Sequence, residues 1–66
     1  QKGKEIFEVH LRPLKLNNDV DIQFLAKQTP GFSGADIANV CNESALIAAR
    51  KDKKEVGRQD FLDAVD

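Results

Sequence analysis

The residues most often used for nucleophilic or metal chemistry are scarce in this chain, which has one histidine, His10, and one cysteine, Cys41. A zinc site needs several His or Cys ligands, and these two residues lie far apart in a pattern that offers no others. Cys41 falls on an apolar helix face, which indicates a small buried side chain rather than a nucleophile. No serine stands in the glycine-flanked turn of a hydrolase nucleophile. We therefore expect no catalytic residue and no metal ligand in these 66 residues.

The start of the third predicted helix could contact a ligand through its backbone. Ser33 is a favourable N-cap, and Asp36 stands where it can complete a capping box. Between them Gly34 and Ala35 carry almost no side chain beside the exposed N–H groups of the first turn. Such a helix start can accept a flat ligand or an anion at close range. It can equally serve to let a neighbouring element pack closely, and spacing alone favours that second interpretation.

His10 follows Ile6 by one turn of a short amphipathic helix predicted from Gly3 to Leu11. One interpretation is a histidine at the edge of the core whose ring nitrogen bonds to backbone. The other is that His10 faces the bare start of the third helix and completes a slot for a planar ligand. Periodicity alone favours the first.

Hydrophobic periodicity predicts an all-α fold of four helices around the third one, without strand pairs. Asp19 or Asp21 can cap the second helix, a charged and solvated connector should follow the third, and Gly57 is a weak cap for the fourth. The third helix is apolar nearly all round, which predicts neighbours on several sides. The second helix is expected to run through residue 28 and the third helix over residues 34–50. The connector should occupy residues 51–55, and the fourth helix should begin at about residue 58.

Size and charge exclude several classes of function. A chain of 66 residues forms one small domain, and its net charge of −1 gives no general attraction to nucleic acid or anionic membranes. No apolar run is long enough to cross a membrane. A helix–turn–helix DNA reader would present Arg, Lys, Asn or Gln where this chain has Gly34, Ala35, Asp36 and Ile37. The polar strip of the third helix is expected to face water; its members are Asn39, Asn42, Glu43 and Arg50.

Three segments resemble a known family. The stretches TPGFSGADIANVCNESALIAAR, IFEVHLRPLKL and QDFLDAV are similar to the small helical lid of AAA ATPases, and in particular to the FtsH-type ATP-dependent zinc metalloproteases. The resemblance covers the chain from Gly3 to Val65. Proteasomal ATPase subunits share SGAD and the trailing DF pair, so a lid of a non-protease unfoldase is the first alternative. A free-standing helical module for protein interaction is the second.

The resemblance implies a nucleotide site shared with a larger α/β subdomain that would hold most of the ATP or ADP and its magnesium. It implies that Ile6 lies against the adenine and His10 near the ribose and adenine. Gly34 and Ala35 would lie at the edge of the base. Many wider relatives carry an arginine at the position of Ala35 that reaches the phosphates, so this lid should add little phosphate chemistry.

The resemblance also implies a parent protein of which residues 1–66 are the C-terminal lid of the ATPase module. That parent would be a membrane-anchored protease with zinc in another domain and this segment on the cytoplasmic or mitochondrial matrix side. Its partners would be neighbouring subunits of a homo- or hetero-hexamer and unfolded or membrane protein substrates, with no nucleic acid. The fragment alone would hydrolyse neither ATP nor peptide bonds.

Overall fold

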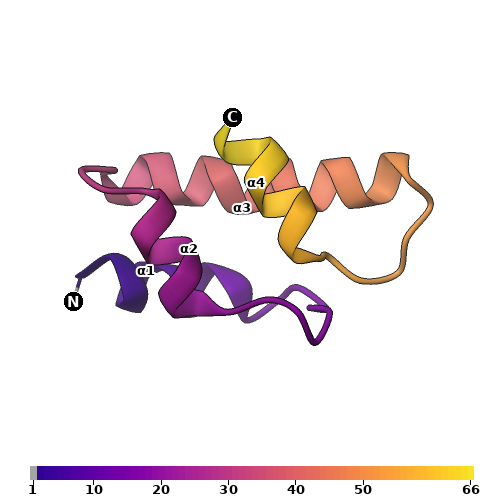
Figure 1. Ribbon diagram of the computed structural model, residues 1–66, viewed down its shortest axis with the longest axis horizontal. Helices are drawn as coiled ribbons and strands as arrows, with labels where there is room; N and C mark the ends of the chain where they lie inside the picture. Colours follow the sequence, from indigo (N-terminus) through magenta and orange to yellow (C-terminus); the bar gives the residue numbers. More distant parts are fainter. Residues whose placement is uncertain (1) are drawn as a thin grey trace.

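A computed structural model describes residues 2–66, which form four helices and no named strand. The longest, α3, runs the length of the molecule, with α1 alongside it in the same general direction and α4 crossing it (Figure 1). The predicted all-α fold around the third helix is thereby confirmed. The helices are α1 (Lys2–Leu11), α2 (Ile22–Gln28), α3 (Gly34–Arg50) and α4 (Arg58–Val65).

The start of α3 is fixed by the predicted capping box. The Ser33 hydroxyl accepts a hydrogen bond from the Asp36 amide at 3.1 Å, and the Asp36 carboxylate accepts one from the Ser33 amide at 3.0 Å. Two of the N–H groups near the helix start are satisfied in this way. The apolar core then assembles along one face of the helix. It consists of Phe7, Leu11, Leu25, Ile37, Val40, Cys41, Ala48, Val56 and Phe61.

Two side chains with polar atoms, Ser44 and Cys41, are buried in the middle of α3. Ser44 is fully buried, and its hydroxyl donates to the Cys41 carbonyl at 2.7 Å. Burial raises the pKa of the Cys41 thiol to about 11, so the reactive thiolate is rare at neutral pH. Cys41 is therefore a small core residue, as its place on the apolar face indicates.

Neighbours do not surround α3 on all sides. Leu46 on its outer surface is 54% exposed, and Ala49 is exposed as well. The expectation of neighbours on several sides is confirmed by α1 and α4, which both pack on α3, although Leu46 and Ala49 stay exposed. Apolar side chains on a helix are thus an incomplete guide to what covers it.

The segment between α1 and α2 supplies caps for two different helices. Asp21 caps α2, where its carboxylate accepts from the Gln23 amide at 3.0 Å. Asp19 reaches α4 instead and accepts from the Arg58 amide at 3.1 Å. Of the two candidate caps for α2, Asp21 is therefore the one that caps it. Asp19 bonds instead to a residue 39 positions away in the sequence.

One isolated parallel β-bridge joins Leu16 to Val56, but neither residue belongs to a strand, so the expected all-α fold without strand pairs holds for the described residues. The Asn17 amide donates to the Val56 carbonyl at 2.9 Å, and the Val56 amide donates to the Lys15 carbonyl at 2.8 Å. The bridge satisfies backbone groups next to the buried Val56 side chain. The bridge and the hydrogen bond from the Arg58 amide to Asp19 together hold the start of α4 against the segment before α2.

The connector between α3 and α4 is more ordered than a solvated linker. It opens with a Schellman turn, in which the Asp52 amide donates to the Ala49 carbonyl and the Lys53 amide to the Ala48 carbonyl, each at 3.0 Å. Asp52 adopts the left-handed backbone conformation that this turn requires, with φ of 59°. Although the connector residues 51–55 are exposed, the turn directs Lys51 and Lys53 back toward α4.

Those two lysines bind Asp60, whose side chain is fully buried. Lys53 Nζ donates to Asp60 Oδ2 at 2.6 Å, Lys51 Nζ donates to Oδ1 at 3.1 Å, and the Gly57 amide donates to Oδ2 at 2.9 Å. Burial alone would raise the pKa of Asp60, but these hydrogen bonds outweigh it and lower the pKa to about 2. Asp60 is therefore a buried carboxylate with full charge at neutral pH.

Gly57 is the N-cap of α4 and has no side chain that could accept a hydrogen bond there. A Cβ at this position would lie 3.2 Å from Lys53 Nζ, so the ammonium group occupies the space of a conventional cap side chain. Asp60 and Asp19 supply the missing acceptors at the start of α4. Gly57 itself offers no side-chain cap, as expected, and these two carboxylates take its place at the start of α4.

Candidate functional site

Ile6 and Gly34, two of the predicted ligand-contacting residues, are neighbours in space. A Cβ built on Gly34 would lie 3.7 Å from Ile6 Cδ1. Ile6 and Gly34 are both half-buried, while Ala35 is exposed. The α1 helix therefore contributes an apolar side chain at the edge of the bare first turn of α3.

His10 lies on the same side of α1 as Ile6, one turn further along, because residues four apart in a helix share a face. It is half-buried. The helices α1 and α3 run in the same general direction (Figure 1), and His10 lies in the last turn of α1, one turn after Ile6. The structure thus places Ile6 beside Gly34, which Ala35 follows in α3, and His10 one turn further along α1.

The chemistry of this end suits a neutral, flat ligand better than an anion. The amides of Gly34 and Ala35 belong to the first turn, whose N–H groups have no acceptor within the helix. The side chains over these amides are only a hydrogen atom and a methyl group, with Ile6 beside Gly34. Asp36, however, places a carboxylate in the same turn, held by the capping box. Its charge opposes binding of a phosphate there and leaves the edge of a base as the better partner.

Among residues 2–66, no group of three or more His, Cys, Asp or Glu side chains is placed to hold a metal ion. None of the described helices is both long enough and apolar enough to span a bilayer.

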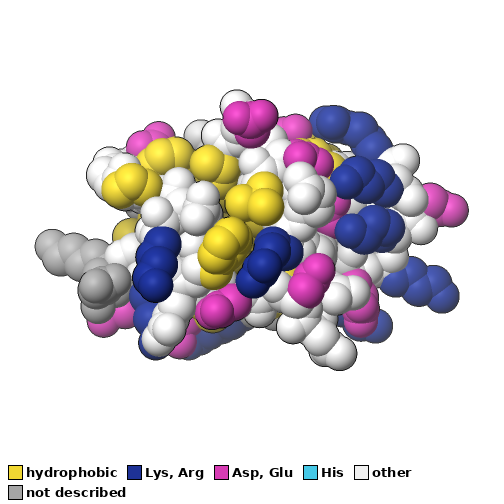
Figure 2. Space-filling view, in the orientation of Figure 1, with side chains coloured by type: hydrophobic (Ala, Val, Ile, Leu, Met, Phe, Trp, Pro, Cys, Tyr) yellow, Lys and Arg dark blue, Asp and Glu magenta, His cyan; other side chains and the backbone are white. Residues whose placement is uncertain are grey.

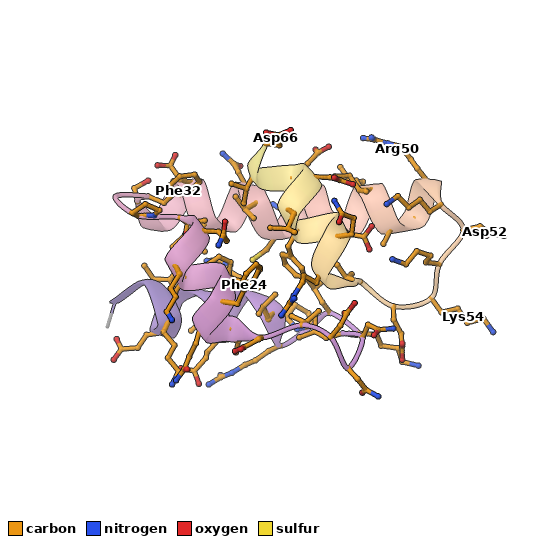
Figure 3. The ribbon with its side chains drawn as sticks, in the orientation of Figure 1. Phe24, Phe32, Arg50, Asp52, Lys54 and Asp66 are labelled. Carbon is orange, nitrogen blue, oxygen red and sulfur yellow. The ribbon has the colours of Figure 1, made fainter. Side chains whose placement is uncertain are left out.

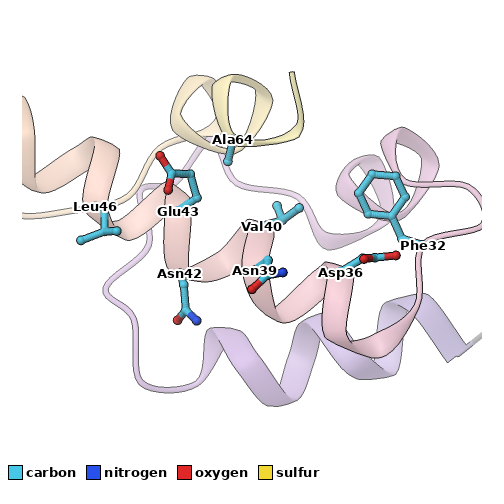
Figure 4. A pocket seen from close by; sticks show the side chains of 8 residues that line it. All are labelled: Phe32, Asp36, Asn39, Val40, Asn42, Glu43, Leu46 and Ala64. Carbon is cyan, nitrogen blue, oxygen red and sulfur yellow. The ribbon is translucent and has the colours of Figure 1, made fainter.

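A second surface feature lies on the outer face of α3 and was not predicted. It is a shallow groove between the turn before α3 and the end of α4, which we call the α3 groove (Figure 4). Periodicity assigned Asn39, Asn42 and Glu43 to a solvated strip, and the position of α4 shows that they also line a hollow. Its lining consists of Phe32, Asp36, Asn39, Val40, Asn42, Glu43, Leu46 and Ala64.

Comparison with known proteins identifies one family over most of the chain. The sequence profile of the AAA+ lid domain matches residues 19–63, a stretch that contains α2, α3 and most of α4. The match includes the Gly34–Ala35 turn and excludes α1, which carries Ile6 and His10.

Individual relatives extend the similarity to α1. A protein of Parabacteroides distasonis named ATP-dependent zinc metalloprotease FtsH is 71% identical over 63 residues, which cover 96% of this chain and 9% of that protein. A Rhodothermus marinus protein of the same name is 63% identical and covers 94% of this chain with 9% of its own length. ATP-dependent zinc metalloprotease FtsH 3 of Symbiobacterium thermophilum is 57% identical over 98% of this chain and 10% of its own. The chain thus spans about a tenth of the length of these relatives.

Proposed function

The chain belongs to the AAA+ lid domain family and is similar to the lid of FtsH-type proteases, and from this we propose that it covers the adenosine end of a bound nucleotide. Ile6 packs against the adenine in this proposal, and the Gly34–Ala35 turn meets the edge of the base. His10 lies near the ribose and adenine. ATP or ADP and its magnesium are held mainly by a larger α/β subdomain elsewhere in the parent protein.

The observation that supports this proposal best is the contact geometry of Ile6 and Gly34. Ile6 beside Gly34 offers an apolar surface next to the first turn of α3, whose amides have no acceptor within the helix. A purine needs both, because its faces are apolar and its edge accepts hydrogen bonds. The carboxylate of Asp36 agrees with an adenine rather than a phosphate at this position.

We further propose that the parent is an ATP-dependent zinc metalloprotease whose zinc and peptidase residues lie outside these 66 residues. The lid would couple ATP binding and hydrolysis to unfolding and degradation of unfolded or membrane proteins in a homo- or hetero-hexamer. A membrane anchor elsewhere in the parent would leave this segment on the cytoplasmic or mitochondrial matrix side. The names of the relatives support the protease over a proteasomal unfoldase or a free-standing interaction module.

The reading frame of the parent tests the choice among these alternatives. We expect a P-loop about one α/β domain upstream of residue 1 and an HExxH zinc motif downstream of residue 66. A P-loop without HExxH would identify the non-protease unfoldase. Absence of both would favour the interaction module.

Replacement of His10 tests the nucleotide site directly. We expect His10→Ala in the whole protein to weaken nucleotide affinity by about 1–2 kcal/mol, as loss of a hydrogen bond and a stacking contact would. Val9→Ala is the matched control, because Val9 lies on the same helix and is 56% exposed. Isothermal titration of ADP measures both variants. Equal affinities in His10→Ala and Val9→Ala would remove His10 from the site.

A further inference from the structure

Two adjacent lysines of the connector lie in different surroundings. Four of the ten Lys and Arg residues fall within residues 50–54, and Figure 2 shows cationic side chains gathered at this end of the molecule. Lys54 points away from the helices into solvent (Figure 3), whereas Lys53 turns back toward α4 and binds Asp60. The same primary amine is therefore offered once in the open and once in a contact.

The amine of Lys53 is held on two sides. Its Nζ donates to Asp60 Oδ2 at 2.6 Å, which is a short charge-assisted hydrogen bond. It also lies 3.2 Å from the position that a Cβ on Gly57 would take, so the ammonium group sits against the backbone at the start of α4. An additional group on this nitrogen has no room there. Because the side chain is still 37% exposed, the nitrogen can reach solvent once it leaves Asp60.

Asp60 depends on that nitrogen more than an exposed carboxylate would. Its side chain is fully buried, and its donors are Lys53, Lys51 and the Gly57 amide. An acyl group on Lys53 would replace the ammonium group with a neutral, bulkier amide. A buried carboxylate that loses a charged partner is destabilised. Since Asp60 lies in the first turn of α4, the loss would fall on the contact of α4 with the connector.

Lys51 is less suited to the same chemistry. Its Nζ is shared between the buried Asp60 at 3.1 Å and the exposed Asp63 at 3.5 Å. The hydrogen bond to Asp60, together with the charges of both carboxylates, raises the pKa of Lys51. The deprotonated amine that attacks an acyl group is therefore rarer at Lys51 than at an ordinary lysine.

We propose that Lys53 is a protected acylation site: its Nζ reacts with an activated acyl donor only after it leaves Asp60, and the amide formed keeps the connector from closing on α4. The donor class is an acyl phosphate. The deprotonated amine attacks the acyl carbon, the N–C bond forms, and the C–O bond to phosphate breaks. The proton that the amine loses passes through water to the departing phosphate. This inference uses only contacts of the connector and α4, so it does not depend on the proposed nucleotide site.

Acetylation rates in the purified whole protein test the protection. Acetyl phosphate is the probe, and tandem mass spectrometry follows positions 53 and 54 in the same sample. We expect Lys54 to be acetylated at least about tenfold faster than Lys53, because the latter must first break a charge-assisted hydrogen bond. In urea that unfolds the protein the two rates should converge. Equal rates in the folded protein, or a difference that persists in urea, would overturn the proposal.

Removal of the Asp60 charge tests the cause of the protection. Asp60→Asn should raise the acetylation rate of Lys53 at least about fivefold and leave that of Lys54 unchanged. Asp63→Asn is the matched control, because Asp63 is exposed and its listed ion pair is with Lys51, and it should change neither rate. An unchanged Lys53 rate in Asp60→Asn would show that Asp60 does not protect the amine.

The consequence of acylation is measured without either variant. Suppression of an amber codon places ε-acetyllysine at position 53 in one sample of the whole protein and at position 54 in the control. Hydrogen exchange read by mass spectrometry should show the α4 amides exchanging at least about tenfold faster with the modification at position 53, because local opening exposes them. Equal exchange in the two samples would contradict the claim that acylation of Lys53 releases α4.

Discussion

The two ends of α3 differ in how their polar groups are satisfied. At the start, the capping box bonds the Ser33 and Asp36 amides on the surface, and Gly34 and Ala35 place little side chain over the first turn. At the far end, a Schellman turn, two lysines and the buried Asp60 satisfy one another. One helix thus has an open end and a closed end.

This difference assigns separate tasks to the two ends. A buried carboxylate with three donors contributes to stability and holds α4 against the rest of the fold. Uncovered amides beside an apolar side chain contribute little to stability, but they can be used by a ligand. Substitutions at the closed end should therefore change folding, and substitutions at the open end should change binding.

The largest effect is expected at Asp60. Asp60→Asn removes the charge that Lys51 and Lys53 contact and should lower the free energy of unfolding by about 2–3 kcal/mol, as loss of charge-assisted hydrogen bonds does. Asp63→Asn is the control, because Asp63 contacts Lys51 at 3.5 Å between exposed groups and should cost less than about 1 kcal/mol. Urea denaturation of the 66-residue chain measures both. A similar decrease in the free energy of unfolding in the two variants would contradict the stabilising role of the buried Asp60 carboxylate.

Low pH should reduce the stability of the chain by protonating Asp60. The pKa of Asp60 is about 2 in the folded chain, below its ordinary value of 3.8, so its contribution is complete above pH 4 and is lost as the pH falls toward 2. The shift corresponds to about 2 kcal/mol. Urea denaturation from pH 6 to pH 2 should show this loss in the unmodified chain and much less of it in Asp60→Asn. Parallel pH profiles for the two chains would show that Asp60 is not the group responsible.

At the open end we expect binding to change while folding does not. A Cβ at Gly34 meets Ile6 at an ordinary contact distance of 3.7 Å, so Gly34→Ala should fold with its stability kept or slightly raised. The added methyl group narrows the approach to the amides and should weaken nucleotide affinity of the whole protein by about 1 kcal/mol. Denaturation and ADP titration together test this separation. If Gly34→Ala lowers the free energy of unfolding and leaves nucleotide affinity unchanged, the start of α3 contributes to folding rather than to binding.

The smallest effect is expected at Asp52, which holds a left-handed conformation with φ of 59°. Glycine adopts this conformation without strain, so Asp52→Gly should raise the free energy of unfolding by about 0.5 kcal/mol. Asp66→Gly at the exposed last position is a control in which no gain is expected. Thermal denaturation resolves the two, and a destabilised Asp52→Gly would show that the Asp52 side chain supports the turn.

The contrast between the ends also explains what could be predicted. The capping box, the bounds of α3 and the burial of Cys41 follow from residues close together in sequence, and each is confirmed. The closed end depends on contacts between residues 7 to 39 positions apart, such as Lys53 with Asp60 and Asp19 with Arg58. No local pattern marks an aspartate in the first turn of α4 as buried, because the same residue serves there as an ordinary exposed cap.

The open end was predicted in part. Periodicity left His10 and the Gly34–Ala35 turn with two interpretations each, and the family resemblance alone assigned them to a nucleotide. The structure adds the adjacency of Ile6 and Gly34, which no spacing rule could give because the two residues lie on different helices. The α3 groove was missed since it forms only where α4 approaches the polar strip of α3.

The structure of the whole protein with bound ADP tests the central claim most directly. The account predicts that the adenine ring lies against Ile6, with its edge at the Gly34 and Ala35 amides and His10 near the ribose. A nucleotide that touches none of these four residues would contradict it.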